Sequence, residues 1–183
     1  SVRETLKKVL EDVRRELKKL SDKLRKVLED SRRNVKRASD KLREVLKRVK
    51  EEIERLRREI DKKELEEILE RVLREVKKLV EDVNRINRKV LKENTDLVRE
   101  VDDINKRVAE EVDELVERLK RVDKEEIAKR IIEEIKKLLD RVREVNEDVI
   151  RRMKKSNEDL DRRNEEVRKR IEDLLEKVAR DAK

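Results

Sequence analysis

Apolar residues recur every three or four positions along the first third of the chain. Steps of three and four place side chains on one face of an α-helix, so this spacing predicts a long amphipathic helix. No Gly or Pro interrupts the pattern, and a β-rich fold would need turn residues that the chain lacks. The apolar positions of this first stripe are Val2, Leu6, Val9, Val13, Leu17, Leu20, Leu24, Val27, Val35, Ala38, Leu42, Val45, Val49, Ile53, Leu56 and Ile60.

The phase of the apolar stripe changes twice, which excludes one continuous helix. Moved eighteen residues onward, Val49 falls on Glu67, whereas the second stripe uses Ile68 instead. The same projection fails past residue 122, where Val108 falls on Glu126. We therefore expect three helices, at about 2–60, 62–122 and 124–181.

Each expected helix begins with a capping signal. A small polar residue that is followed three residues later by Glu can form a capping box, in which side chains bond the free N–H groups of the first turn. The boxes predicted here pair Ser1 with Glu4, Asp61 with Glu64, and Asp123 with Glu126. The connections near 61–63 and 123–125 are short, so neighbouring helices must be antiparallel. The sequence thus predicts an all-α fold: one elongated up-down-up three-helix bundle spanning residues 1–183 as a single domain.

The apolar stripes repeat every eighteen residues. "SDKLRKVLED" begins at Ser21 and "SDKLREVLKR" begins at Ser39, eighteen positions later. Eighteen residues make five turns of an ideal helix, at 3.6 residues per turn and ~1.5 Å per residue. Repeats of seven or eleven residues impose a supercoil, whereas this repeat does not. Nearly straight helices of about 60 residues, each ~90 Å long, are therefore expected.

Polar residues interrupt the apolar faces at matching heights in the expected antiparallel register. Asn87 and Asn105 occupy the phase of Leu69, and Asn146 and Asn164 are likewise eighteen residues apart. A buried amide without a partner costs ~1–3 kcal/mol, so these residues are expected to form interhelical hydrogen-bond networks that select the register. The three predicted polar layers are Ser21, Asn105 and Asn146; Ser31, Asn94, Ser156 and Asn157; and Ser39, Asn87 and Asn164.

The alternative for these polar residues is that some reach solvent at the edge of the stripe. For Ser21 and Ser39, which lie at that edge, both interpretations stay open. Asn34 and Asn84 lie further out, and we expect them to be solvated or peripheral.

The whole chain resembles a de novo, parametrically designed untwisted helical bundle with built-in polar networks. Equal helices, near-identical capped loops and a Lys/Arg/Glu surface carry this resemblance. Natural three-helix repeats such as spectrin are similar in topology but contain aromatic residues and irregular loops. The resemblance implies a very stable, monomeric structural scaffold without an evolved substrate, soluble in the cytoplasm of an expression host.

Composition narrows the chemistry further. Charged residues make up 58% of the chain, while His, Cys and aromatic residues are absent. Without His or Cys there is no side chain to act as base or nucleophile near neutral pH, and no Glu-x-x-His motif to hold metals, so we expect no enzyme, metal site or cofactor. No run of eighteen apolar residues exists to cross a membrane.

Partners are not expected, and one alternative is kept. The net charge of +8 comes entirely from residues 1–61, where "SRRNVKRASDK" begins at Ser31. Without aromatic residues to stack on bases, this segment could bind polyanions only weakly and without sequence specificity. The alternative function is a helical interaction module that forms a homo-oligomer or pairs with partner helices. The width of each apolar face, which suits three helices closing on one another, favours the monomer.

Overall fold

A computed structural model describes residues 2–59 and 63–182 of the chain. It contains three helices: α1 (Val2–Glu59), α2 (Lys63–Lys120) and α3 (Glu125–Asp181). Every helix begins and ends within two residues of the expected bounds, and the described residues contain no strand. The predicted all-α three-helix fold is therefore confirmed.

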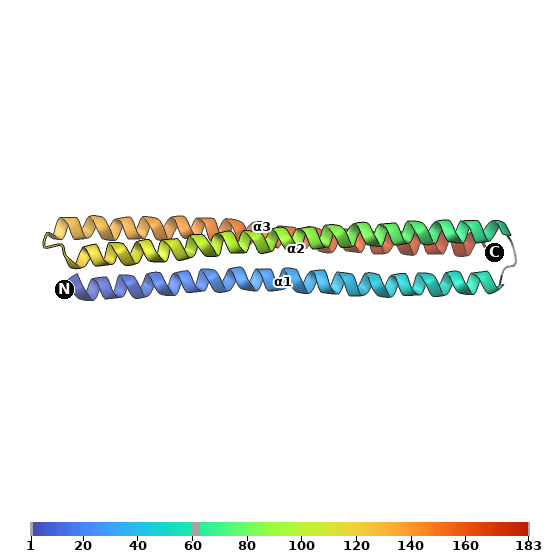
Figure 1. Cartoon of the computed structure of the whole chain (residues 1–183), viewed down its shortest axis with the longest axis horizontal. Coiled ribbons are helices and arrows are strands. Elements are labelled where there is room, and N and C mark those ends of the chain that lie inside the picture. Colours follow the sequence, from blue (N-terminus) through green and yellow to red (C-terminus); the bar gives the residue numbers. More distant parts are fainter. Residues whose placement is uncertain (1, 60–62, 183) are drawn as a thin grey trace. The chain divides into compact units, whose positions relative to one another are not determined.

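The described part of the chain divides into two compact units. Unit 1 contains residues 1–29 and 93–154, and unit 2 contains residues 30–92 and 155–183. Each unit holds one segment of every helix. Within each unit the segment of α2 runs antiparallel to the segments of α1 and α3, as the colours along the helices show (Figure 1).

Unit 1 has its own apolar core. The fully buried side chains at its centre include Val112 and Leu119 from α2 and Ile135 from α3. Leu6, Val13, Leu17 and Leu20 of α1 belong to the same cluster. The members follow the three- and four-residue steps of the stripes, so the apolar face that the sequence predicts is the face that is buried.

Unit 2 has a second, separate core. Leu69 and Val76 of α2 and Ile171 of α3 are completely buried. From α1 the cluster takes Leu42, Val45, Val49, Ile53 and Leu56. On each helix, the residues between the two clusters include the predicted polar layers. Buried apolar residues also lie between the two clusters along the helices, among them Leu24, Met153 and Leu160.

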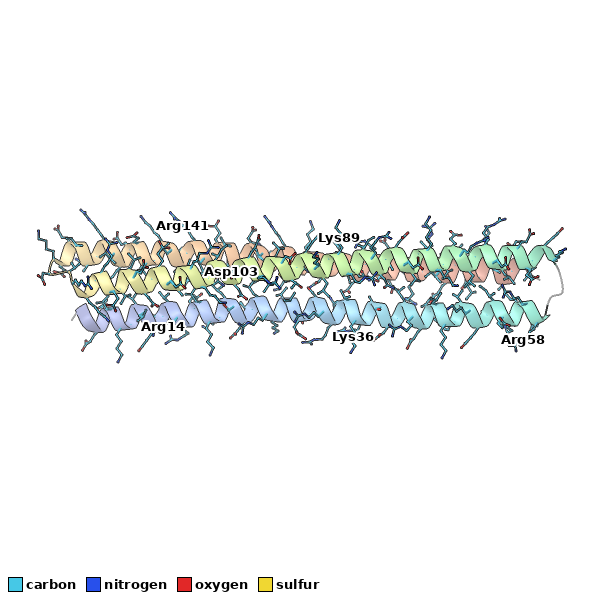
Figure 2. The ribbon with its side chains drawn as sticks, viewed as in Figure 1. Arg14, Lys36, Arg58, Lys89, Asp103 and Arg141 are labelled. Carbon is cyan, nitrogen blue, oxygen red and sulfur yellow. The ribbon has the colours of Figure 1, made fainter. Side chains whose placement is uncertain are left out.

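Charged side chains occupy the outer faces of the helices. Figure 2 labels six of them: Arg14, Lys36 and Arg58 on α1, Lys89 and Asp103 on α2, and Arg141 on α3. Arg14 reaches toward α2, where its Nη2 lies 3.8 Å from Oδ1 of Asp113. All six are exposed. This separation of apolar and charged faces is the arrangement expected of amphipathic helices.

The connection between α2 and α3 lies at residues 121–124 rather than at the predicted 123–125. The N–H groups of Arg121 and Val122 donate to carbonyls three residues earlier, each at 3.2 Å, which tightens the end of α2. The N–H of Ala128 donates to the carbonyl of Lys124 at 3.2 Å, so Lys124 supplies the first acceptor of α3. Asp123, predicted to be the cap, lies one residue before this position.

The other predicted caps are described only in part. Ser1 and Asp61 lie outside the described residues. Glu4 and Glu64 stand in the first turns of α1 and α2, and Glu126 stands in the first turn of α3. Carboxylates favour this end of a helix because its free N–H groups carry partial positive charge.

Candidate functional site

Seven polar side chains are buried in the described part of the chain, and all belong to the predicted layers. Their exposed fractions lie between 0% for Asn146 and 8% for Asn164. The others are Ser31, Asn87, Asn94, Asn105 and Asn157. Ser21, Ser39 and Ser156 are half-buried at the stripe edge. Hydrogen-bonded polar residues in the interior are therefore confirmed.

Asn105 and Asn146 form a reciprocal pair between α2 and α3 in unit 1. Nδ2 of Asn105 donates to Oδ1 of Asn146 at 3.0 Å, and Nδ2 of Asn146 donates back to Oδ1 of Asn105 at 2.8 Å. Nδ2 of Asn146 also donates to the carbonyl of Val142 at 2.7 Å, one turn earlier on α3. Each amide thus replaces the water that it loses on burial.

Asn87 and Asn164 repeat this arrangement in unit 2. The two amides exchange hydrogen bonds, both 2.9 Å long. Nδ2 of Asn164 donates to the carbonyl of Leu160 at 2.7 Å, as Asn146 does to Val142. Every partner is displaced by eighteen residues from its counterpart in unit 1, backward on α2 and forward on α3. The eighteen-residue repeat of the sequence is therefore a repeat of hydrogen-bond geometry.

The middle layer contains a bond between α1 and α3. Oγ of Ser31 donates to Oδ1 of Asn157 at 2.6 Å, and both side chains are buried in unit 2. Asn94 is buried in unit 1, as predicted for an interior position, whereas Ser156 is half-buried. The structure thus brings together Ser31 and Asn157, which were expected in the same layer.

Ser21 and Ser39 take no part in the reciprocal amide bonds. Each asparagine pair satisfies itself through its own amides and one backbone carbonyl of α3. The sequence left open whether these serines face the interior or reach solvent. In the structure both are half-buried beside the stripe, and neither is a member of the bonded pairs.

Sequence reasoning missed two side-chain hydrogen bonds between α1 and α3. In unit 1, Nε of Arg143 donates to Oε1 of Glu16 at 2.9 Å. In unit 2, Nδ2 of Asn34 lies 3.5 Å from Oδ2 of Asp161. Glu16 and Asn34 are eighteen residues apart, as are Arg143 and Asp161, so the same periodicity could have revealed them. Asn34, expected to be solvated or peripheral, is half-buried.

Surface ion pairs lower the pKa of two carboxyl groups. A hydrogen bond from Arg55 lowers the pKa of Glu52, and one from Arg168 lowers the pKa of Glu165. A lowered pKa means that each pair stabilises the fold at neutral pH and loses this contribution as the carboxylate is protonated in acid. Both pairs lie near the surface, where water and salt screen them, so their contribution is small.

The geometry defines what the polar layers can do. Ser31 and the paired asparagines form side-chain hydrogen bonds between helices, and Asn146 and Asn164 also donate to backbone carbonyls of α3. The described residues include no group of three or more carboxylates that could hold a metal ion.

Replacement of Asn94 with leucine is expected to keep or raise the melting temperature while loosening the specificity of assembly. Leucine is apolar and of similar size, so it can occupy the buried position of Asn94 without placing a polar group in the apolar interior. Thermal melts followed by circular dichroism, with light scattering for the assembly state, measure both effects. Unfolding of the Asn94→Leu variant at room temperature would show that the polar layers stabilise the fold rather than select its register.

None of the described helices has a stretch of sufficient length and apolarity to span a lipid bilayer. No protein-family model, curated protein or solved structure matches the chain.

Proposed function

We propose that this chain is a designed structural scaffold whose buried polar layers specify helix register, and that it carries no natural biochemical activity. The observation that supports this most directly is the repeated amide pair. Asn105 with Asn146, and Asn87 with Asn164, make the same two side-chain bonds and the same backbone bond, eighteen residues apart.

The amide pairs discriminate between registers because of their burial. A slip of α3 by one turn would place Asn146 and Asn164 opposite apolar side chains of α2. Each buried amide would then lose its partner, at ~1–3 kcal/mol apiece. Apolar side chains alone tolerate such slips more readily, because leucine and valine contacts have no direction. Polar residues placed at single core positions are known to fix register in this way.

The scaffold is expected to be a monomer. Size-exclusion chromatography with light scattering should give a mass near 22.3 kDa that does not change with concentration. The physical reason is that the apolar faces of the three helices are buried against one another. A mass at a clean multiple of this value would overturn the monomeric scaffold.

An interaction module is the second candidate, and it rests on four exposed apolar residues. They stand in eighteen-residue pairs at one edge of each stripe: Ile68 and Ile86 on α2, and Ile127 and Val145 on α3. If this edge pairs with another copy, the light-scattering mass should double, and the double variant Ile127→Lys/Val145→Lys should restore the monomer. The variant Lys106→Gln, on an exposed face, serves as the control.

A further inference from the structure

A groove lies between α1 and α2 in unit 1, and its lining differs from the rest of the surface. It has a volume of about 570 Å³, which is within the range of small-molecule sites. Leu6, Lys7 and Leu10 line it from α1. From α2 and the residues after it come Val116, Leu119, Lys120 and Val122.

The side chains on the floor of the groove are apolar. Leu6, Val116 and Leu119 are buried beneath it, while Leu10 and Val122 are half-buried along its sides. All five belong to, or pack against, the apolar core of unit 1. A ligand that enters the groove therefore meets hydrocarbon, and the part of the ligand that contacts the floor must be apolar too.

The only charges in the lining are two ammonium groups, those of Lys7 and Lys120. Both lysines are exposed. Nζ of Lys120 lies 3.0 Å from Oε1 of Glu117, which is itself at the surface and outside the lining. An exposed pair of this kind is weak, so Lys120 can exchange Glu117 for an anionic ligand.

Two other grooves in the described part of the chain serve as comparisons, and both mix the two signs of charge. One lies in unit 2 between α1 and α3, where Arg37, Lys41 and Arg168 face Asp161 and Glu165. The other, also in unit 2, is lined by Arg48 and Arg55 together with three glutamates: Glu51, Glu52 and Glu172. Their cations already have carboxylate neighbours, as in the contacts of Arg168 with Glu165 and of Arg55 with Glu52.

We propose that the groove of unit 1 binds a single alkyl chain that ends in an anionic head group, such as a fatty acid. The alkyl chain lies on Leu6, Leu10, Val116, Leu119 and Val122, and the head group is held at the rim by Lys7 and Lys120. This site is independent of the scaffold role, because it uses neither amide pair. An apolar floor with only positive charges at its rim complements this class of ligand and disfavours a cationic amphiphile.

Dodecanoate, kept below its micelle concentration, is the probe. Isothermal titration calorimetry should show one site per chain, and methyl NMR should shift the signals of Leu6, Leu10, Val116 and Leu119 first. Burial of each methylene group strengthens binding about fourfold, so decanoate should bind more weakly than dodecanoate, and octanoate more weakly still. Dodecyl phosphate should bind like dodecanoate, whereas dodecyltrimethylammonium should bind at least tenfold more weakly.

A matched pair of variants tests the head-group contact. Lys7→Gln/Lys120→Gln removes both rim charges while retaining most of each side chain, and should weaken dodecanoate about tenfold. Lys23→Gln/Lys106→Gln changes two exposed lysines of the same helices and the same unit, with the same loss of net charge, and should leave the affinity unchanged. All four positions are exposed, so both variants should keep the circular dichroism spectrum of the parent.

Three results would overturn the site. One is equal weakening by the two double variants, which would assign the effect to net charge. Another is equal affinity for dodecanoate and dodecyltrimethylammonium. The third is binding of many dodecanoate molecules per chain, with shifts spread over both units, which would indicate detergent-like association rather than a groove.

Discussion

Replacement of Asn146 alone with leucine is expected to lower the free energy of unfolding by about 2 kcal/mol. The substitution removes both amide bonds of the pair at once. Asn105, which is 4% exposed, is then left with a buried carbonyl and a buried amino group that water cannot reach. Denaturation in guanidinium chloride, fitted by linear extrapolation, measures the change.

The double variant Asn105→Leu/Asn146→Leu distinguishes a bonded pair from two independent residues. Replacing both partners by apolar groups of similar shape removes the unsatisfied amide, so stability is expected to return to the parental value or to exceed it. The coupling energy between the two sites should therefore be ~0.5–3 kcal/mol. Asn87 and Asn164 should give the same cycle in unit 2. Asn84→Leu, at a half-buried position of α2, should change stability by no more than ~0.5 kcal/mol.

The amide pairs would be shown to contribute nothing as pairs if the single variant were as stable as the double variant. Additive effects in both cycles would lead to the same conclusion. In the first case the residues would be interchangeable with leucine one at a time, and in the second each residue would act independently of its partner. In both cases register would have to be set by contacts other than the amide pairing.

Truncation of a core isoleucine is expected to open one unit and leave the other closed. Ile135 and Ile171 are both completely buried on α3, two eighteen-residue repeats apart, and they belong to the separate cores of units 1 and 2. Replacing either with alanine leaves a cavity that costs ~2–5 kcal/mol. Because apolar contacts are concentrated within each cluster, Ile135→Ala should accelerate amide exchange in residues 1–29 and 93–154, and Ile171→Ala in residues 30–92 and 155–183.

Native-state hydrogen exchange followed by NMR or mass spectrometry resolves these segments. The two variants are each other's control, since residue type, helix and burial are the same. A uniform loss of protection along the whole chain in both variants would mean that the described residues open as one cooperative unit. This result would support the single domain that the sequence predicts.

Much of the fold could be predicted because its cause is local. The steps of three and four residues indicate helices, and the phase changes near residues 61 and 123 divide them. Short connections then set the relative heights of α2 and α3, which is why Asn105 and Asn146 were expected at one level. The sequence did not fix the start of α3 to the residue. The carbonyl of either Asp123 or Lys124 could accept the first hydrogen bond of the helix, and in the structure the carbonyl of Lys124 does so.

The sequence by itself determined the number of helices and the buried face through its periodicity, and the direction of the helices and their relative heights through the short connections. The tertiary structure alone decided which polar groups at one height bond each other. Asn105 pairs with Asn146 while Ser21 does not join them, and Ser31 bonds Asn157. Two further features follow only from the tertiary structure: the two separate apolar cores, and the groove between Lys7 and Lys120. The physical reason is that residue spacing sets the height and angle of a side chain on its own helix. A hydrogen bond also depends on the distance between helices and on the rotamer that their side chains leave free.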